Sequence, residues 1–471
     1  MMMLDFLPLN IYLIDHNYCT KDNEQEENMG KNLLIIGGGA GGASTAAEAK
    51  RNDPSLNVTI LQKGKFVSYA SCPTPYYIGD LIKDHNKLVA RTPERFNRDG
   101  IDVQLDAEVI NIDSRKNVID LKDGRQFPYE ILVMATGTSA IVPDMTGIDL
   151  PGVYALRNLE DAINIKTWLK EKNAKRVVIV GGGFIGLEMS EALHAAGIST
   201  TIIHKDALPA NRWDAALSSM MLEELQAHGV EFVTNAAAQA IEKGSEQSLR
   251  VNTDQGAFEG DMVLLAIGVR PDAQLAKSID LKIGKTGAIA VNFAQQTSMP
   301  NVYAVGDCCE SFHKVSKTWV NIPLGDIANK QGRVAGRNIG GRPLTFEGVV
   351  GAQSFRLFNL ECAATGLSEK EALAAGYTPL SNITWGSAMA PSLGMRKIGL
   401  KLTADKSSGK LLGAQAVGVA DVVGRINTLS VALWAGMTLD AISYLDLAYA
   451  PPFSAAWDII HNAAQALRRT I

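Results

Sequence analysis

A single cysteine, Cys72, lies in a stretch whose composition could make its thiol reactive. It follows Ser71, and prolines at positions 73 and 75 mark the first turn of a predicted short helix. Proline is tolerated there because the first N–H groups of a helix have no intrahelical partner. A thiol at a helix N-terminus is near the positive end of the helix dipole, which stabilises the thiolate and lowers the pKa. We therefore expect a nucleophile or a redox centre at Cys72, with a buried structural cysteine as the alternative.

The chain before Cys72 contains a glycine-rich turn of the kind that binds a dinucleotide. An apolar run at residues 32–36 leads into Gly37, Gly39 and Gly42, in the spacing G-x-G-x-x-G, and a segment of helical composition follows. The first glycine makes the turn, the second lets a pyrophosphate approach the backbone, and the third lets helix and strand pack closely. Gln62 ends the next predicted strand, where an acidic residue would bind a ribose hydroxyl. Its side-chain carbonyl can accept the same hydrogen bond, but without a charge.

The same arrangement recurs in the middle of the chain. An apolar run at residues 177–180 leads into Gly181, Gly183 and Gly186, and another predicted helix follows. Two complete strand–turn–helix–strand patterns predict two bound dinucleotides, one at each turn. A chance pair of structural glycine turns is the weaker alternative.

The strand that follows the second turn bears on the choice of nicotinamide nucleotide. An acidic residue at its end favours an unphosphorylated ribose, whereas a cation favours the 2′-phosphate. His204 and Lys205 stand at this place, with Arg212 close by in the sequence. The pattern therefore favours NADPH over NADH, unless all three side chains are simply solvated.

Three further apolar runs end in residues that could contact a cofactor, at Gly137, Gly268 and Asp307. An aspartate placed after an apolar strand and a glycine can accept hydrogen bonds from a polyol chain. It can also cap a helix, and both roles are compatible. From about residue 343 the chain has alternating apolar runs and then apolar helical stretches, which predict a separate α+β domain.

The composition is that of a globular protein from a reducing compartment. The 471 residues are 46% hydrophobic and 20% charged, and a net charge of −5 gives no electrostatic basis for binding nucleic acid or an anionic membrane. The length predicts two or three domains. Five cysteines without regular spacing argue against a disulfide scaffold and favour the cytoplasm. Residues 1–28 are interpreted as a disordered extension, because Met29 directly precedes the first predicted strand.

Together these motifs resemble those of the FAD-dependent pyridine nucleotide–disulfide oxidoreductases. The motifs that carry the resemblance are the two glycine fingerprints, Ala135-Thr136-Gly137, Gly306-Asp307, residues 328–333 and the terminal stretch 446–454. Relatives of the glutathione reductase type have a second cysteine where this chain has Tyr77. The chain is therefore similar to the single-cysteine branch, which holds coenzyme A disulfide reductases, NADH oxidases and peroxidases, and persulfide reductases.

The resemblance implies an α/β fold with two Rossmann-like dinucleotide-binding domains, as in glutathione reductase, and a C-terminal α+β dimerisation domain. The implied domains are an FAD-binding domain (29–146 and 271–342), an NAD(P)-binding domain (147–270) and the dimerisation domain of a homodimer (343–471). Cys72 would lie against the flavin on the face opposite the nicotinamide. Tyr449, from the second subunit, would donate a proton, although a packed aromatic is an equal alternative. The implied cofactor-binding positions are Gly37, Gly39, Ala40, Gly41, Gly42, Gln62, Lys63, Ser71, Val109, Ala135, Thr136, Gly137, Asp307, Gly181, Gly183, Phe184, Ile185, Gly186, Glu188 (which would orient the nicotinamide), His204, Lys205 and Gly268.

The leading hypothesis is a reductase that uses FAD and NADPH or NADH. Electrons would pass through the flavin and Cys72 to a low-molecular-weight disulfide, most of all CoA disulfide or a CoA persulfide or polysulfide. The oxidases and peroxidases have a histidine in the first glycine loop, where this chain has Ala40 or Gly41, so the resemblance favours a reductase. Against a close match, Ser71 replaces the usual asparagine, and the sequence ends without a rhodanese-like domain, which disfavours a persulfide substrate.

Two other functions remain open from the sequence. One is an NAD(P)H oxidase on the same scaffold, which would reduce dioxygen through a sulfenate of Cys72. The other belongs to a different class, a flavin-bearing redox sensor or electron-transfer protein without a committed small substrate. Fold does not decide between them.

Overall fold

The computed structural model describes residues 30–245 and 248–471, so the predicted extension at residues 1–28 lies outside the described part of the chain. Its first sheet is parallel, in the order β18-β7-β1-β2-β3. Along the central strand, Leu33 and Ile35 face one apolar cluster while Leu34 and Ile36 face another, which explains the uninterrupted apolar run. The strands are β1 (Asn32–Ile36), β2 (Asn57–Leu61), β3 (Ile101–Gln104), β7 (Ile131–Met134) and β18 (Val302–Ala304).

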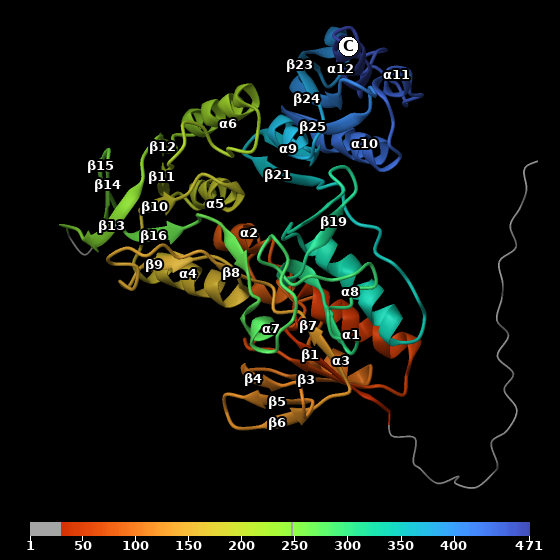
Figure 1. Ribbon diagram of the computed structural model, residues 1–471. Coiled ribbons are helices and arrows are strands. Elements are labelled where there is room, and N and C mark those ends of the chain that lie inside the picture. The colour runs from red at the N-terminus through yellow and green to blue at the C-terminus, as the bar shows by residue number, and fades with distance from the viewer. Residues whose placement is uncertain (1–29, 246–247) are drawn as a thin grey trace, which may run out of the picture. The chain divides into compact units, whose positions relative to one another are not determined.

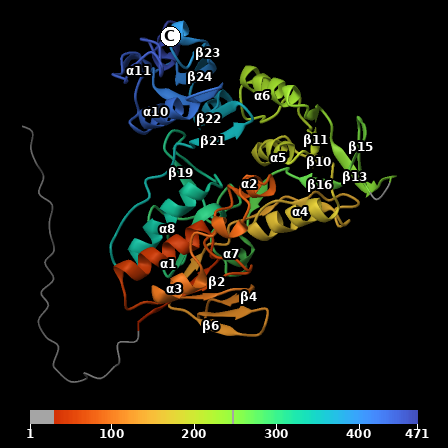
Figure 2. The same cartoon turned by 180° about the vertical axis from the view of Figure 1, so that it is seen from behind.

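Two helices that are far apart in the sequence, α1 (Ala40–Asn52) and α8 (Gly325–Ile339), lie side by side in both views (Figures 1 and 2). Glycines make this contact close. A Cβ added at Gly332 would come within 2.4 Å of the Gly41 carbonyl oxygen, and one at Gly336 within 2.7 Å of the Thr45 carbonyl oxygen. The backbone of α8 therefore supports α1 directly, and with it the first glycine turn.

The second sheet repeats the plan of the first. It is parallel, in the order β12-β11-β10-β16-β9. Its central strand, β10, is again followed in the chain by a glycine turn and a helix. The strands are β9 (Val153–Ala155), β10 (Arg176–Val180), β11 (Ser199–Ile203), β12 (Glu231–Val233) and β16 (Met262–Leu265), and the helices are α4 (Leu159–Glu171), α5 (Phe184–Ala195) and α6 (Ala215–Ala227). In both sheets the strand that precedes the glycine turn, β1 or β10, has a neighbour on each side. A crevice therefore forms at the carboxyl ends of the strands, where ligands bind in such folds.

The third sheet is antiparallel, in the order β21-β22-β25-β24-β23. Its strands are β21 (Gln353–Leu357), β22 (Leu360–Gly366), β23 (Pro379–Ser387), β24 (Lys397–Asp405) and β25 (Leu411–Gly418), with the helices α9 (Glu369–Ala374), α10 (Val422–Trp434), α11 (Leu439–Ile442) and α12 (Ile459–Arg468). Two parallel α/β sheets and one antiparallel C-terminal sheet confirm the predicted fold class. The domain boundaries stay predictions.

Smaller elements connect these sheets. Two of them are three-stranded antiparallel sheets, one formed by β4 (Val109–Asp113), β5 (Val118–Leu121) and β6 (Gln126–Pro128), the other by β13 (Ala238–Lys243), β14 (Leu249–Thr253) and β15 (Gly256–Gly260). Two are strand pairs, β8 (Thr138–Ala140) with β17 (Val269–Pro271) and β19 (Ser311–His313) with β20 (Thr318–Val320). The remaining helices are α2 (Thr74–Ile78), α3 (Pro93–Arg98) and α7 (Gln274–Ser278). Among the described residues, no helix combines the length and the apolar character that crossing a membrane requires.

Candidate active site

Each of the three glycines of the first turn is needed for a different physical reason. At Gly37, where φ is +103°, an added Cβ would come within 2.2 Å of the Ala135 carbonyl oxygen. At Gly42 it would come within 1.9 Å of the Gly37 carbonyl oxygen, whereas at Gly39 it would meet no atom of the described chain within 4 Å. Gly37 and Gly42 are therefore required by the protein's own packing. Gly39 is not, so the space in front of it is available to a ligand.

The second glycine turn repeats this geometry. A Cβ at Gly181, where φ is +117°, would come within 2.4 Å of the Ala266 carbonyl oxygen, and one at Gly186 within 2.1 Å of the Gly181 carbonyl oxygen. At Gly183 it would again meet nothing in the described chain within 4 Å. Two turns with the same division of roles fit two ligands of the same class.

The helices that follow the two turns leave their N-terminal N–H groups open. Neither α1 nor α5 has a side-chain hydrogen bond from its N-cap, Gly39 or Gly183, and neither has an acidic residue in its first turn. Free N–H groups and the positive end of the helix dipole make such an end a binding site for phosphate. Both turns can therefore bind a pyrophosphate.

The residues at the two strand ends serve the turns themselves. Gln62 Oε1 accepts a hydrogen bond from the Gly38 N–H at 2.8 Å, and His204 Nδ1 accepts one from the Gly182 N–H at 3.1 Å. The carbonyl of Gln62 keeps a second lone pair for a ribose hydroxyl. His204 is different, because it is buried and burial lowers its pKa, so the ring is neutral.

The prediction that His204 contributes positive charge for a 2′-phosphate is therefore wrong. The sequence pattern could not show that the ring lies under the turn rather than in solvent. Arg212 is also engaged, because it forms an ion pair with Glu371 at 2.9 Å. Lys205 is exposed at the strand end and is placed to meet a ligand there.

A cleft of about 1700 Å³ opens in front of the first turn. It brings together most of the positions expected on that side, namely Gly37, Gly39, Ala40, Gly41, Gln62, Lys63, Ser71, Cys72, Val109, Ala135, Thr136, Gly137 and Asp307. Gly42 does not line it, because it packs behind the turn. The expected nicotinamide-side residues Gly181, Gly183, Phe184, Ile185, Gly186, Glu188, His204, Lys205 and Gly268, and also Tyr449, lie outside the lining of this cleft.

The thiol of Cys72 is exposed in the cleft, but its electrostatic setting differs from the expected one. Desolvation raises the pKa of Cys72, and the Glu188 carboxylate raises it further, while a hydrogen bond with Ser71 acts in the opposite direction. The prediction of a lowered pKa is therefore wrong for the chain's own groups. The reason lies in the helix: α2 has only five residues, prolines 73 and 75 have no N–H, and the Thr74 N–H donates to the Ser71 carbonyl. Few donors remain for a thiolate.

The same carboxylate links the two glycine turns. Glu188 lies in the first turns of α5, and burial, together with the neighbouring Glu191, raises its pKa to about 7. Its charge acts on Cys72, which also feels Asp307 from the side of the first turn. Groups from both dinucleotide turns therefore converge on one thiol.

Replacing Glu188 by glutamine is expected to lower the pKa of Cys72, because it removes a negative charge and keeps the size of the side chain. The thiolate is the reactive form, so alkylation of Cys72 by iodoacetamide should reach its half-maximal rate at a lower pH. Mass spectrometry of the Cys72 peptide after timed alkylation measures this. Glu347→Gln, which removes a carboxylate bound to Lys314, is the matched control and leaves the profile unchanged. A profile that stays in place in Glu188→Gln, or moves to higher pH, contradicts the coupling.

Asp307 is held by a residue that sequence reasoning missed. Arg157 Nη2 binds Asp307 Oδ2 at 2.8 Å and Arg157 Nε donates to the Thr138 carbonyl at 3.0 Å, and both side chains line the cleft. Burial raises the pKa of Asp307, and Arg157 opposes that shift. The N-cap of the short 3-10 helix at Gly306–Cys308 is Val305, so a capping role for Asp307 is wrong. Arg157 precedes a helix in a different part of the chain and carries no motif that could have revealed it.

The other cysteines are packed in the interior. Of the four cysteines that the structure describes, Cys308, Cys309 and Cys362 are buried and Cys72 is exposed. Burial raises the pKa of all three buried thiols. All three are therefore structural cysteines of the interior.

Comparisons with known proteins identify the scaffold. Residues 31–332 match the family described as pyridine nucleotide-disulphide oxidoreductase, and residues 353–459 match its dimerisation domain. The NAD(P)H coenzyme A polysulfide/persulfide reductase of Pyrococcus horikoshii is 38% identical over 446 residues, which cover 94% of this chain and 99% of that protein. An NADH oxidase of Methanocaldococcus jannaschii is 33% identical over 443 residues, covering 92% and 97%. Coenzyme A disulfide reductases of Staphylococcus aureus are 30% identical over 437 residues, covering 91% and 98%.

A solved structure agrees with the sequence comparison. The NAD-dependent persulfide reductase from A. fulgidus superimposes with a TM-score of 0.90 at 34% identity, covering 93% of this chain and 83% of that one. The P. horikoshii protein, whose name gives polysulfide and persulfide reduction, is matched over 99% of its own length. The two family matches together span most of the chain, which belongs to the pyridine nucleotide-disulphide oxidoreductases.

Proposed function

We propose that the protein is a flavoprotein that passes electrons from NAD(P)H, through Cys72, to persulfides, polysulfides or disulfides of coenzyme A. One observation carries the proposal: Cys72 lies in the cleft of the first glycine turn and is acted on by Glu188 from the helix of the second. A thiol that lies in the cleft of one dinucleotide turn and close to the helix of the other suits electron transfer from a nicotinamide to sulfur. The names of the relatives support the sulfur chemistry and the role of CoA.

The cleft of the first turn has the chemistry that FAD requires. Gly39 leaves room for a pyrophosphate at the open end of α1, and Lys63, although paired with Glu108 at 2.7 Å, adds a cation at the strand end. Asp307 and Arg157 together offer an acceptor and donors to a polyol chain. FAD bound there supplies the transfer of an electron pair between a nicotinamide and a disulfide of Cys72. The other residues that line the cleft would surround it.

The second turn would bind the nicotinamide nucleotide. The open N-terminus of α5 suits its pyrophosphate, and Glu188, one turn further along the same helix, would meet the nicotinamide end. Lys205 alone now supports a preference for NADPH.

The reaction at Cys72 follows thiol–disulfide exchange. The thiolate attacks a disulfide of CoA, so that a bond between Cys72 and one CoA sulfur forms while the S–S bond of the substrate breaks and a CoA thiolate leaves. With a CoA persulfide the leaving group is hydrosulfide. In both cases two electrons from NAD(P)H then reduce the mixed disulfide, which releases the bound CoA as a thiol and restores the Cys72 thiolate. Tyr449 of a second copy would protonate the leaving group.

A dimer would bring that tyrosine to the site. Residues 353–459 match a dimerisation domain, and Tyr449 is 54% exposed. Tyr444, Phe453 and Trp457 are exposed to 75%, 70% and 51%, in the same part of the chain. Large apolar side chains exposed together mark an interaction surface, so we propose a homodimer through this face.

The test is substrate-dependent oxidation of NADPH and of NADH by the purified protein. Oxidation should be fast with CoA disulfide or CoA persulfide and slow in air alone, and faster with NADPH. Mass spectrometry of the protein as purified should find CoA on Cys72. NAD(P)H oxidation in air that is as fast without a sulfur substrate as with one, together with oxygen rather than CoA bound to Cys72, would instead support an NAD(P)H oxidase. One relative is named as an NADH oxidase. Slow oxidation under all conditions would support the redox sensor.

A further inference from the structure

Tyr449 lies in a segment, residues 445–458, that contains neither helix nor strand, although the structure describes all of it. It links α11 to α12 and turns at Ala450, whose carbonyl accepts from the N–H groups of Phe453 and Ser454. A segment without a ladder of backbone hydrogen bonds depends on side chains for its conformation. The position of Tyr449 therefore depends on contacts between this segment and the elements packed around it.

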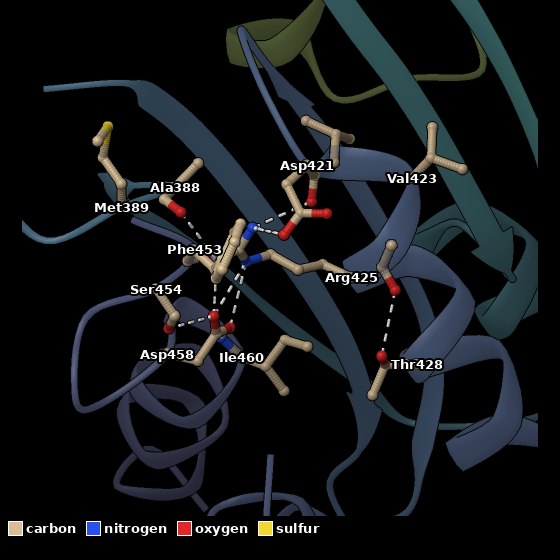
Figure 3. A network of polar contacts seen from close by, with 12 residues as sticks. Ala388, Met389, Asp421, Val423, Arg425, Thr428, Phe453, Ser454, Asp458 and Ile460 are labelled. Atoms are coloured by element: carbon tan, nitrogen blue, oxygen red, sulfur yellow. Dashed lines mark hydrogen bonds and ion pairs between the residues drawn. The ribbon is translucent and has the colours of Figure 1, made fainter. Parts of the chain in front are cut away.

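The main anchor is a buried arginine of α10. Arg425, whose side chain is 5% exposed, binds Asp458 through Nε at 3.1 Å and through Nη2 at 2.7 Å (Figure 3). Its Nη2 also donates to the Phe453 carbonyl at 3.3 Å and to the Ala388 carbonyl at 3.3 Å. Its Nη1 donates to the Asp421 side chain at 2.8 Å. The guanidinium thus joins α10, the loop after β23 and both the turn and the end of the Tyr449 segment.

Three smaller contacts complete the anchoring. Ser454 Oγ donates to Asp458 at 2.9 Å, and the Ala390 N–H donates to the Pro451 carbonyl at 2.9 Å. At the other end, His461 Nε2 and the Leu445 carbonyl are 2.8 Å apart. The segment is therefore held on both sides of Tyr449, while the tyrosine itself projects into solvent.

A buried ion pair of this kind is weak evidence for stability, because desolvation of the two charges offsets much of their attraction. The geometry of its contacts instead indicates a role in orienting the Tyr449 segment. Two of the groups that Arg425 binds, the Asp458 carboxylate and the Phe453 carbonyl, belong to the Tyr449 segment. The planar guanidinium fixes directions that a flexible cation cannot. Among the described residues, no hydrogen bond or ion pair joins Asp458 or Ser454 to Tyr449, so their effect on the tyrosine passes through the backbone.

We propose that Arg425 is a positioning residue: with Asp458 it sets the backbone of the segment that presents Tyr449 to the Cys72 site of a second copy. The inference rests on the proposed function, in which Tyr449 protonates the leaving thiolate. It predicts that Arg425 matters for turnover only as long as Tyr449 is a tyrosine.

The test is a double-mutant cycle with Arg425→Lys and Tyr449→Phe. Lysine keeps the charge but lacks the planar set of N–H donors that a guanidinium presents. Small misplacements of a reacting group lower rates by about 10- to 100-fold. Arg425→Lys should therefore lower kcat with CoA disulfide by about that factor, with KM for NADPH unchanged, and should cost nothing further in Tyr449→Phe. Hydrogen–deuterium exchange should rise in residues 446–454.

The outcomes are separable. An equal loss from Arg425→Lys in both backgrounds, or unchanged exchange in the segment, overturns the positioning role. If Tyr449→Phe alone leaves kcat unchanged, the role proposed for Tyr449 fails, and the inference fails with it. Arg468→Lys, which alters a partly exposed ion pair with Asp440 in the same part of the fold, is the matched control and leaves kcat unchanged. Should Arg425→Lys not fold, Ser454→Ala removes a single contact to Asp458 and must show the same dependence on Tyr449, with a smaller loss.

Discussion

Cys72→Ser is expected to lower turnover with CoA disulfide by about 10³-fold or more, the order of loss seen when an enzyme nucleophile is removed. Serine is nearly the same size, but its hydroxyl does not ionise near neutral pH and cannot form a disulfide. Electrons from NAD(P)H would still enter the protein, because nothing at the two glycine turns changes. The measurement is steady-state oxidation of NADPH with CoA disulfide, together with the visible flavin spectrum of the purified variant.

The spectrum separates the interpretations of that experiment. A variant that keeps its flavin and loses turnover places Cys72 on the route of the electrons and argues against a sensor without a substrate. Cys362→Ala, which removes a thiol buried in β22, is the matched control and retains turnover. Undiminished turnover with CoA disulfide in Cys72→Ser would overturn the proposed mechanism.

The second large effect is expected from one substitution at each glycine turn. Valine at position 39 or 183 would meet no atom of the described chain near its Cβ, so the protein should fold in both cases. Its side chain would occupy the space in front of an open helix end, where a pyrophosphate must approach. Gly39→Val should therefore yield folded protein without flavin. Gly183→Val should retain flavin and raise KM for NADPH about 100-fold, equivalent to about 2.7 kcal/mol.

This pair of variants assigns the two ligands to the two turns. The measurements are the flavin content of the purified protein and KM for NADPH. Gly42→Ala is the contrasting control: its Cβ would lie 1.9 Å from the Gly37 carbonyl oxygen, so it should destabilise the fold itself. Loss of flavin in Gly183→Val but not in Gly39→Val would reverse the assignment.

The glycine turns show what a sequence can predict. Their three roles depend on backbone contacts within a few residues and across one neighbouring strand, and the spacing of Gly37, Gly39 and Gly42 encodes them almost completely. The fold class follows from two such turns and an alternating C-terminal pattern. Most residues expected around the first turn do line one cleft.

The errors concern charge and long-range contact. Prolines 73 and 75 correctly indicated a helix start after Cys72, but they also remove the N–H donors that would have stabilised a thiolate. Glu188, which raises the pKa of Cys72, is more than 100 positions away in sequence. Arg157 and Arg425 were missed for the same reason, because each binds a carboxylate that is distant in sequence and is brought close only by the tertiary fold. A single sequence carries no local signal for such pairs.

The contact between α1 and α8 has a consequence for biosynthesis. Ser44 and Asn329, which face each other across these helices, are 285 positions apart, so the helix that supports the first turn is translated long after that turn. The whole second sheet leaves the ribosome in the interval and can condense first, because its strands lie closer together along the chain. Until residue 339 has emerged, the face of α1 that packs against the glycines of α8 stays uncovered. Premature termination before α8 would leave a chain that exposes this face to aggregation and proteolysis.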